Sequence, residues 1–212
     1  MRRILTVTTE PEVTKLTTLA RVKSELDIRD STNDTLLNAK IDEASSDAEA
    51  SLGFTVSRAT VSETFWHSEI MEWPEYLTLD RAPVASIDSV VVDDETIDAS
   101  LYRTDPEIGA LYALDGSGYP CRWLFCKSLV VNYSGGYLLP GQGGRNLPAG
   151  IEGAVVDLMT DFWSARGRDP SVKSEEIPGV LRRDYWIGAV GEEGELPPRV
   201  VMKLAPFRRV NV

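Results

Sequence analysis

The side chains that could do chemistry in this chain are mainly carboxylates. Asp157 and Asp161 stand four residues apart in the run "VVDLMTDFW", and Asp93, Asp94 and Glu95 are consecutive. Paired carboxylates can act as general acid and base or hold a metal ion. The sequence has 33 acidic and 22 basic residues, however, and so acidic a chain also produces such pairs on its solvated surface. We favour the solvated surface and keep a metal-dependent hydrolase as the alternative.

Nucleophiles and nitrogen or sulfur ligands are scarce. The chain has one histidine, His67, which excludes a histidine-based metal cluster and leaves a serine or cysteine nucleophile without its usual base. Cys121 and Cys126 lie five apart in a strand-like run, a spacing that sends side chains to opposite faces, and they lack the paired spacing of a zinc site. We therefore expect structural thiols in a reducing compartment, no cofactor and no metal.

A glycine-dense loop, "SGGYLLPGQGGRNLP", joins a strand-like run to a helix-like one. A phosphate-binding loop would need a lysine after its last glycine, and a dinucleotide fingerprint would need G-x-G-x-x-G after the first strand of a βαβ unit. This loop has no lysine, and Pro148 starts the next helix directly. We expect a mobile, exposed surface loop over 134–147, whose Tyr137, Leu138 and Arg145 suit docking to a partner.

Charge is unevenly distributed. The formal net charge of −11 argues against a surface that wraps nucleic acid, because duplex binding needs clustered cations. The stretch after Glu195 is different, since it carries Arg199, Lys203, Arg208 and Arg209 and no carboxylate. A DNA-binding module centred on this tail is therefore a second alternative. We expect no membrane partner, because no window has the apolar length of a membrane span.

Helical periodicity appears near both ends of the chain. The sequence predicts a helix over about 18–27, capped by Thr17 or Thr18, and a second helix that is capped at 31–33 and ends at Gly53. A third helix is predicted from Pro148 to about Gly167, and a short one around 181–187. The second helix has an apolar stripe, small residues that would let another helix approach closely, and an acidic outer face made of Asp42, Glu43, Asp47 and Glu49.

Between the helical parts, short runs rich in Val, Thr, Tyr and Trp predict antiparallel strands over about 55–134. The predicted fold class is α+β: a helical bundle formed from both ends of the chain, with an inserted antiparallel β-sheet or small sandwich and an extended C-terminal arm. The expected segments are an N-terminal extended segment (1–15), a helical part (16–54), the β region with its connecting loop (55–146), a second helical part (147–190) and the arm (191–212).

The order of three motifs is informative. They are "LTTLARVKSELDI … NDTLLNAKIDEASSDAEASLGF", then "LYALDGSGYPCRW … LVVNYSGGY", then "LPAGIEGAVVDLM". This succession resembles the head-tail connector family of tailed bacteriophages and gene transfer agents, also called adaptor or head-completion proteins. The resemblance covers most of residues 16–165.

The resemblance implies a structural virion protein of the particle neck, made in the host bacterial cytoplasm, and not an enzyme. Such adaptors form a dodecameric ring beneath the portal, extend the DNA channel without binding DNA specifically, and dock the stopper or tail. By this analogy we expect Arg199, Lys203, Phe207, Arg208 and Arg209 to bind the portal, and Tyr137, Leu138 and Arg145 to face the stopper or tail. Asp42, Glu43, Asp47 and Glu49 are the candidates for lining the channel.

Overall fold

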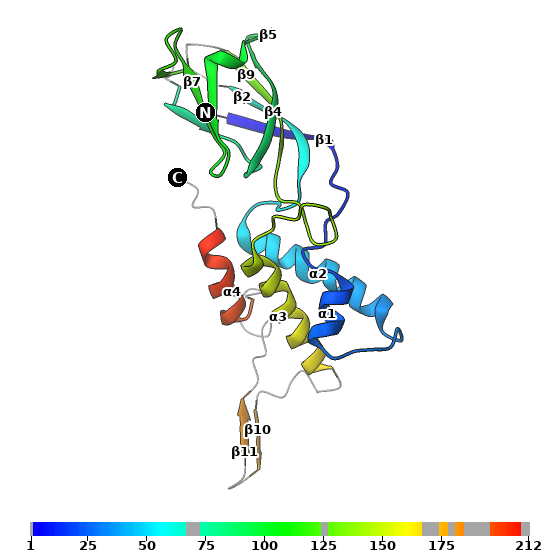
Figure 1. Cartoon of the computed structure of the whole chain (residues 1–212). Coiled ribbons are helices and arrows are strands. Elements are labelled where there is room, and N and C mark those ends of the chain that lie inside the picture. Colours follow the sequence, from blue (N-terminus) through cyan, green and yellow to red (C-terminus); the bar gives the residue numbers. More distant parts are fainter. Residues whose placement is uncertain are drawn as a thin grey trace. The chain divides into compact units, whose positions relative to one another are not determined.

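The computed structural model describes residues 2–66, 73–123, 127–166, 174–177, 181–184 and 196–208, with 174–177 and 181–184 described as backbone only. The chain divides into two compact units, each built from two stretches of sequence (Figure 1). The β unit comprises Met1–Val13 and Phe54–Asn146, and the helical unit comprises Thr14–Gly53 and Leu147–Val212. The predicted α+β class, with helices from both ends of the chain around a β insertion, is confirmed.

The larger sheet of the β unit has five antiparallel strands. They are, in spatial order, β1 (Arg2–Thr9), β2 (Ala59–Trp66), β9 (Ser128–Gly135), β4 (Val84–Val92) and β5 (Glu95–Thr96). The second sheet orders β3 (Tyr76–Thr78), β7 (Ala110–Leu114) and β6 (Tyr102–Asp105), with β8 (Pro120–Cys121) also on β7 and a 3-10 turn, η1 (Ala99–Leu101), before β6.

Residues on β2 and β9 alternate strictly between buried and half-buried, so one face of the larger sheet covers a core. A single apolar cluster takes Val61 and Phe65 from this sheet and Leu77 and Leu111 from the second one. Because both sheets contribute to one core, the β insertion is a small sandwich. The expected N-terminal extended segment is in fact mostly strand β1, which pairs with β2 along its length.

In its described residues the helical unit has four helices: α1 (Leu19–Glu25), α2 (Asp34–Leu52), α3 (Ala149–Ala165) and α4 (Pro198–Leu204), with a 3-10 turn, η2 (Ala205–Phe207), after α4. Helix α3 contacts each of the other three helices (Figure 1). Two predicted caps are present, since the Thr18 hydroxyl accepts from the Arg21 N–H and Gly53 ends α2 with a φ of 79°. Asn33 is the N-cap residue of α2, within the predicted range, but its side chain makes no capping hydrogen bond. No helix in the described ranges is long and apolar enough to cross a membrane.

Two expectations are wrong where the structure describes them. Residues 181–184 form strand β11 (Leu181–Asp184), not a helix, because they pair with β10 (Ser174–Ile177), a partner that local periodicity does not reveal. The C-terminal part is not an extended arm over 198–207, because Val200 and Leu204 are fully buried one helical turn apart. Residues 209–212 lie outside the described residues.

The small residues of α2 also serve the unit itself. Ala44, Ser45 and Ala48 are buried, and the Ser45 hydroxyl accepts a hydrogen bond from the Leu16 N–H at 3.1 Å. They let the helices of one chain approach closely, so this surface is not free for packing against another copy.

Candidate functional surfaces

The basic residues of α4 are held by the carboxylates of α3. Arg199 forms an ion pair with Asp161 and also donates to the Asp157 carbonyl oxygen at 3.3 Å. Lys203 forms an ion pair with the Asp157 carboxylate. The side chains of Arg199 and Lys203 remain 51% and 45% exposed. The Asp157–Asp161 pair and the basic residues of α4 therefore neutralise each other, although the sequence suggested separate roles for them.

The turn after α4 is anchored at two points. The Phe207 ring lies against Gly150, so close that a Cβ at Gly150 would be 2.8 Å from the ring. Arg208 donates to the Ser51 carbonyl oxygen at 2.9 Å and to the Ser51 hydroxyl at 2.8 Å. Four of the five predicted portal-binding residues thus contact the protein's own helices, while Arg209 lies outside the described residues.

The predicted acidic face of α2 exists as a surface. Asp42, Glu43 and Asp47 are exposed and Glu49 is half-buried, on the side away from the buried stripe. Asp42 pairs with Lys15 at 3.4 Å and Glu43 with Lys40 at 2.5 Å. Partial burial, together with the nearby Glu43 charge, raises the pKa of Asp47. The charges of Asp42 and Glu43 are therefore partly neutralised within the chain.

Hydrogen bonds and burial hold the glycine-dense loop more firmly than its composition suggests. Tyr137 is half-buried, and its N–H donates to the Val56 carbonyl at 2.8 Å. Leu138 and Asn146 are joined by two hydrogen bonds, of 2.7 and 3.2 Å, that close the loop. Leu139 is fully buried, so the expectation of an exposed loop is wrong for its first half. Arg145 is exposed, as expected.

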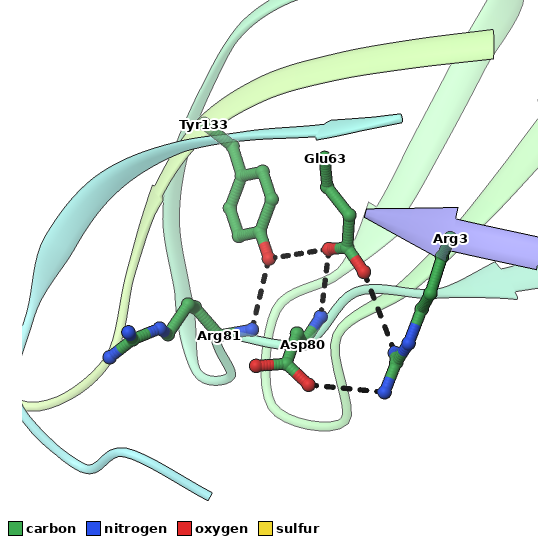
Figure 2. A network of polar contacts seen from close by, with 5 residues as sticks. All are labelled: Arg3, Glu63, Asp80, Arg81 and Tyr133. Carbon is green, nitrogen blue, oxygen red and sulfur yellow. Dashed lines mark hydrogen bonds and ion pairs between the residues drawn. The ribbon is translucent and has the colours of Figure 1, made fainter. Parts of the chain in front are cut away.

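A polar network inside the β unit was missed by the sequence analysis (Figure 2). The Glu63 side chain is fully buried, and one of its oxygens, Oε2, accepts from the Tyr133 hydroxyl at 2.9 Å and from the Asp80 N–H at 3.0 Å. The Tyr133 hydroxyl accepts from the Arg81 N–H at 2.9 Å. Arg3 closes the network from β1, since it pairs with Glu63 at 3.5 Å and with Asp80 at 3.2 Å.

Burial sets the electrostatics of this network. It raises the pKa of Glu63, although the Asp80 N–H, the Tyr133 hydroxyl and Arg3 each oppose the rise. Burial, followed by the Glu63 charge, also raises the pKa of Tyr133. The network ties β1, β2, β9 and the residues after β3 together, so its role is structural. Period-2 alternation was the available signal, because it puts Glu63 on the core face between Val61 and Phe65.

The described part of the chain has no group of three or more His, Cys, Asp and Glu side chains that could hold a metal ion. The metal-dependent hydrolase alternative therefore has no candidate site among these residues. Asp93 is occupied instead in a turn, where its carboxylate accepts from the Lys127 and Ser128 N–H groups. Cys121 is half-buried beside the β core. His67 and Cys126 lie outside the described residues.

Comparison with known proteins gives one family and one fold. Residues 16–92 match the model of the phage gp6-like head-tail connector proteins. Residues 16–92 therefore carry the pattern of the head-tail connector family. The resemblance noted from the sequence motifs is thereby confirmed. No curated protein matches this chain.

Solved structures match this chain along almost its whole length. One is described as the neck of an empty GTA particle computed with C6 symmetry; it is 18% identical, with a TM-score of 0.59 over 99% of this chain and 97% of the other. A second, the neck of a native GTA particle computed with C12 symmetry, is 17% identical, with a TM-score of 0.55 over the same shares. A third match is a chain in the structure described as the virion of a native gene transfer agent particle. It is 16% identical, with a TM-score of 0.55 over 99% of this chain and 97% of the other. At these identities the likeness establishes a shared fold.

Proposed function

We propose that this protein is a head-tail connector, a structural subunit in the neck of a phage or gene-transfer-agent particle. The observation that carries the proposal is the agreement of two independent comparisons. The connector family model matches residues 16–92, and the fold follows solved neck and virion chains over 99% of this chain. A structural role also agrees with the site analysis, in which the acidic clusters of α3 are engaged in ion pairs with α4.

In this proposal the protein assembles as a ring of twelve copies that docks on the portal and receives the stopper or tail. The C6 and C12 symmetries of the related neck structures support a ring, because both are cyclic symmetries that fit twelve copies. Double-stranded DNA would pass through the ring without specific binding. The net charge of −11 suits that role, since carboxylates repel phosphates.

The portal contact is assigned to the C-terminal basic residues. Arg208 follows a turn that Phe207 anchors on Gly150 and donates to the Ser51 carbonyl oxygen, and Arg209 is the next residue in the sequence. Arg199 and Lys203 would contribute through the exposed halves of their side chains, while their ion pairs with α3 hold α4 in place.

The other two surfaces are proposed by position in the chain. Arg145, at the exposed end of the loop, would meet the stopper or tail together with the half-buried Tyr137 and Leu138. The acidic face of α2, made of Asp42, Glu43, Asp47 and Glu49, would line the channel. Charge reversal of Asp47 and Glu43 should then impair DNA retention or ejection, and unaltered particles would remove the lumen assignment.

The deciding experiment is quantitative mass spectrometry of purified particles, which compares the copy number of this chain with that of the portal. Equal copies are expected for a ring matched to the portal. The major capsid protein, present in large excess, is the internal control for loss of material. Absence of the chain from intact, tailed particles would reject the connector proposal.

A further inference from the structure

Strands β10 and β11 form a separate two-stranded sheet within the helical unit (Figure 1). They run antiparallel and pair without a register shift from Ser174↔Asp184 to Ile177↔Leu181. In the part of the chain that the structure describes, neither strand has more than marginal contact with another element, and no third strand pairs with either. Such a short hairpin is at best marginally stable by itself in water, and a further strand on its edge would stabilise it.

The charges of this hairpin are sorted by strand. Strand β10 reads Ser-Glu-Glu-Ile, and β11 reads Leu-Arg-Arg-Asp. The register puts Glu175 opposite Arg183 and Glu176 opposite Arg182. Opposite charges across a ladder would stabilise one hairpin equally well if each strand carried one glutamate and one arginine. Because the signs are sorted instead, one outer edge of the hairpin is acidic and the other is basic.

This sorting selects among the ways in which two copies can pair. A two-fold contact of β10 with β10 brings glutamates together, and one of β11 with β11 brings arginines together, so like charges oppose each other in both. A contact of β11 with β10 of the next copy brings arginines beside glutamates. It is also antiparallel, because strand direction alternates from one hairpin to the next around a cyclic ring. The favoured contact is therefore head-to-tail, the kind that closes rings.

We propose that β11 of each copy pairs with β10 of the next copy, so that the hairpins of one ring form a continuous antiparallel collar. At level register the pairs Glu175–Arg183 and Glu176–Arg182 recur between copies as they do within one hairpin. Asp184 then lies opposite the uncharged Ser174 of the next copy. A ring of twelve copies supplies two strands per copy. With about 4.8 Å between neighbouring strands, the collar is about 37 Å across, an opening that a DNA duplex can pass.

This inference rests on the proposed function and deepens it, because it names a contact between neighbouring copies in the ring. The first test uses full-length chains with Glu176→Cys or Arg182→Cys, assembled into particles separately and as an equal mixture, and then oxidised. A non-reducing gel should show a cross-linked dimer only in the mixture, since β10 of one copy meets only β11 of another. The mixture of Glu175→Cys and Arg183→Cys is tested as well, because narrow and wide pairs alternate along an antiparallel ladder.

Wild-type particles oxidised in the same way control for the native Cys121 and Cys126. A dimer in a sample that contains one variant only, or no dimer in either mixture, would overturn the collar. If the chain is then still present in the same copy number as the portal, the connector proposal stands without the collar. Absence of the chain from tailed particles would reject the connector proposal and the collar together.

The second test separates pairing between copies from pairing inside one hairpin. The variant E175R/E176R/R182E/R183E exchanges the signs but keeps every opposite pair within the hairpin, so it should form particles by itself. Mixed rings put like charges together wherever the two kinds of copy meet. Particles captured through a tag on the exchanged variant should therefore contain at least about tenfold less wild-type chain than particles captured through a tagged conservative variant, E175D/E176D/R182K/R183K. Equal wild-type content in the two captures, or failure of the exchanged variant to assemble by itself, would contradict the proposal.

Discussion

Removal of one hydroxyl group, by Tyr133→Phe, should destabilise the β unit measurably. The Tyr133 side chain is fully buried, and its hydroxyl accepts from the Arg81 N–H and donates to the Glu63 carboxylate, both at 2.9 Å. An orphaned buried N–H costs about 1–3 kcal/mol, and a hydrogen bond to a charged group contributes about 1.5–3 kcal/mol. The ring itself is kept, so no large cavity adds to the loss. We expect a destabilisation of about 3 kcal/mol, because the Asp80 N–H and Arg3 continue to hold Glu63.

The assay must report on the β unit alone, because a chain with two compact units need not unfold in one step. Hydrogen exchange of peptides from β2 and β9, followed by mass spectrometry across a urea series, gives the opening free energy of this unit. Tyr112→Phe is the matched control, since Tyr112 is only half-buried on β7, and we expect a change within about 0.5 kcal/mol there. If the two variants exchange alike, the network in Figure 2 does not stabilise the fold as argued.

Three further substitutions test other parts of the structure. Burial raises the pKa of Glu63 above its ordinary 4.5, so the unfolded chain gives up this proton at a lower pH than the folded chain. Wild-type stability should therefore fall as pH rises from about 4.5 through the folded pKa, and the same exchange assay should show no such loss in Glu63→Gln. Gly135→Ala should cost about 3 kcal/mol or more in that assay, because its Cβ would lie 2.0 Å from the Arg81 carbonyl oxygen. Gly150→Ala should displace the Phe207 ring and make the Phe207–Arg208 bond accessible to chymotrypsin, which cleaves after aromatic residues, whereas Gly153→Ala, whose Cβ would meet only Lys203 Nζ at 3.8 Å, should not.

Local signals in the sequence were sufficient for the long helix α2 and for the central strands of the larger sheet. The stripe through Leu37 and Ile41, with a cap before it and Gly53 after it, predicted α2 almost to the residue, and alternation predicted β2 and β9. These signals are periodicities of 3.6 and 2 that one element carries by itself. Pairing between distant segments has no such local signal. The Arg3–Glu63 contact spans 60 residues and the Arg208–Ser51 contact spans 157, so neither could be inferred from a single sequence.

The C-terminal segment shows how composition misled the site prediction. Four cations without a carboxylate in the same stretch suggested a free arm, but Arg199 and Lys203 have their partners on α3, about 40 residues earlier in the chain, and Arg208 has its partner, Ser51, on α2. The signal for a packed helix was present in the spacing of Val200 and Leu204 after two prolines. Charge pattern alone could not separate a docked basic helix from a free one. Asp157 and Asp161, which balance these cations, had been considered only as a possible acid–base or metal-binding pair.

Residues 16–92, which match the family model, include neither β9, the central strand of the larger sheet, nor α3, the central helix of the helical unit. Residues 16–92 supply α1 and α2 to the helical unit and β2, β3 and β4 to the β unit. Strand β9 lies between β2 and β4, and α3 contacts α1, α2 and α4; both of these central elements come later in the chain. Without β9 the two long strands of the matched segment are not neighbours, and without α3 the buried stripe of α2 loses its main cover. The fold of this chain therefore depends on elements outside residues 16–92, which is why a structural likeness over 99% of the chain adds to what the family model establishes.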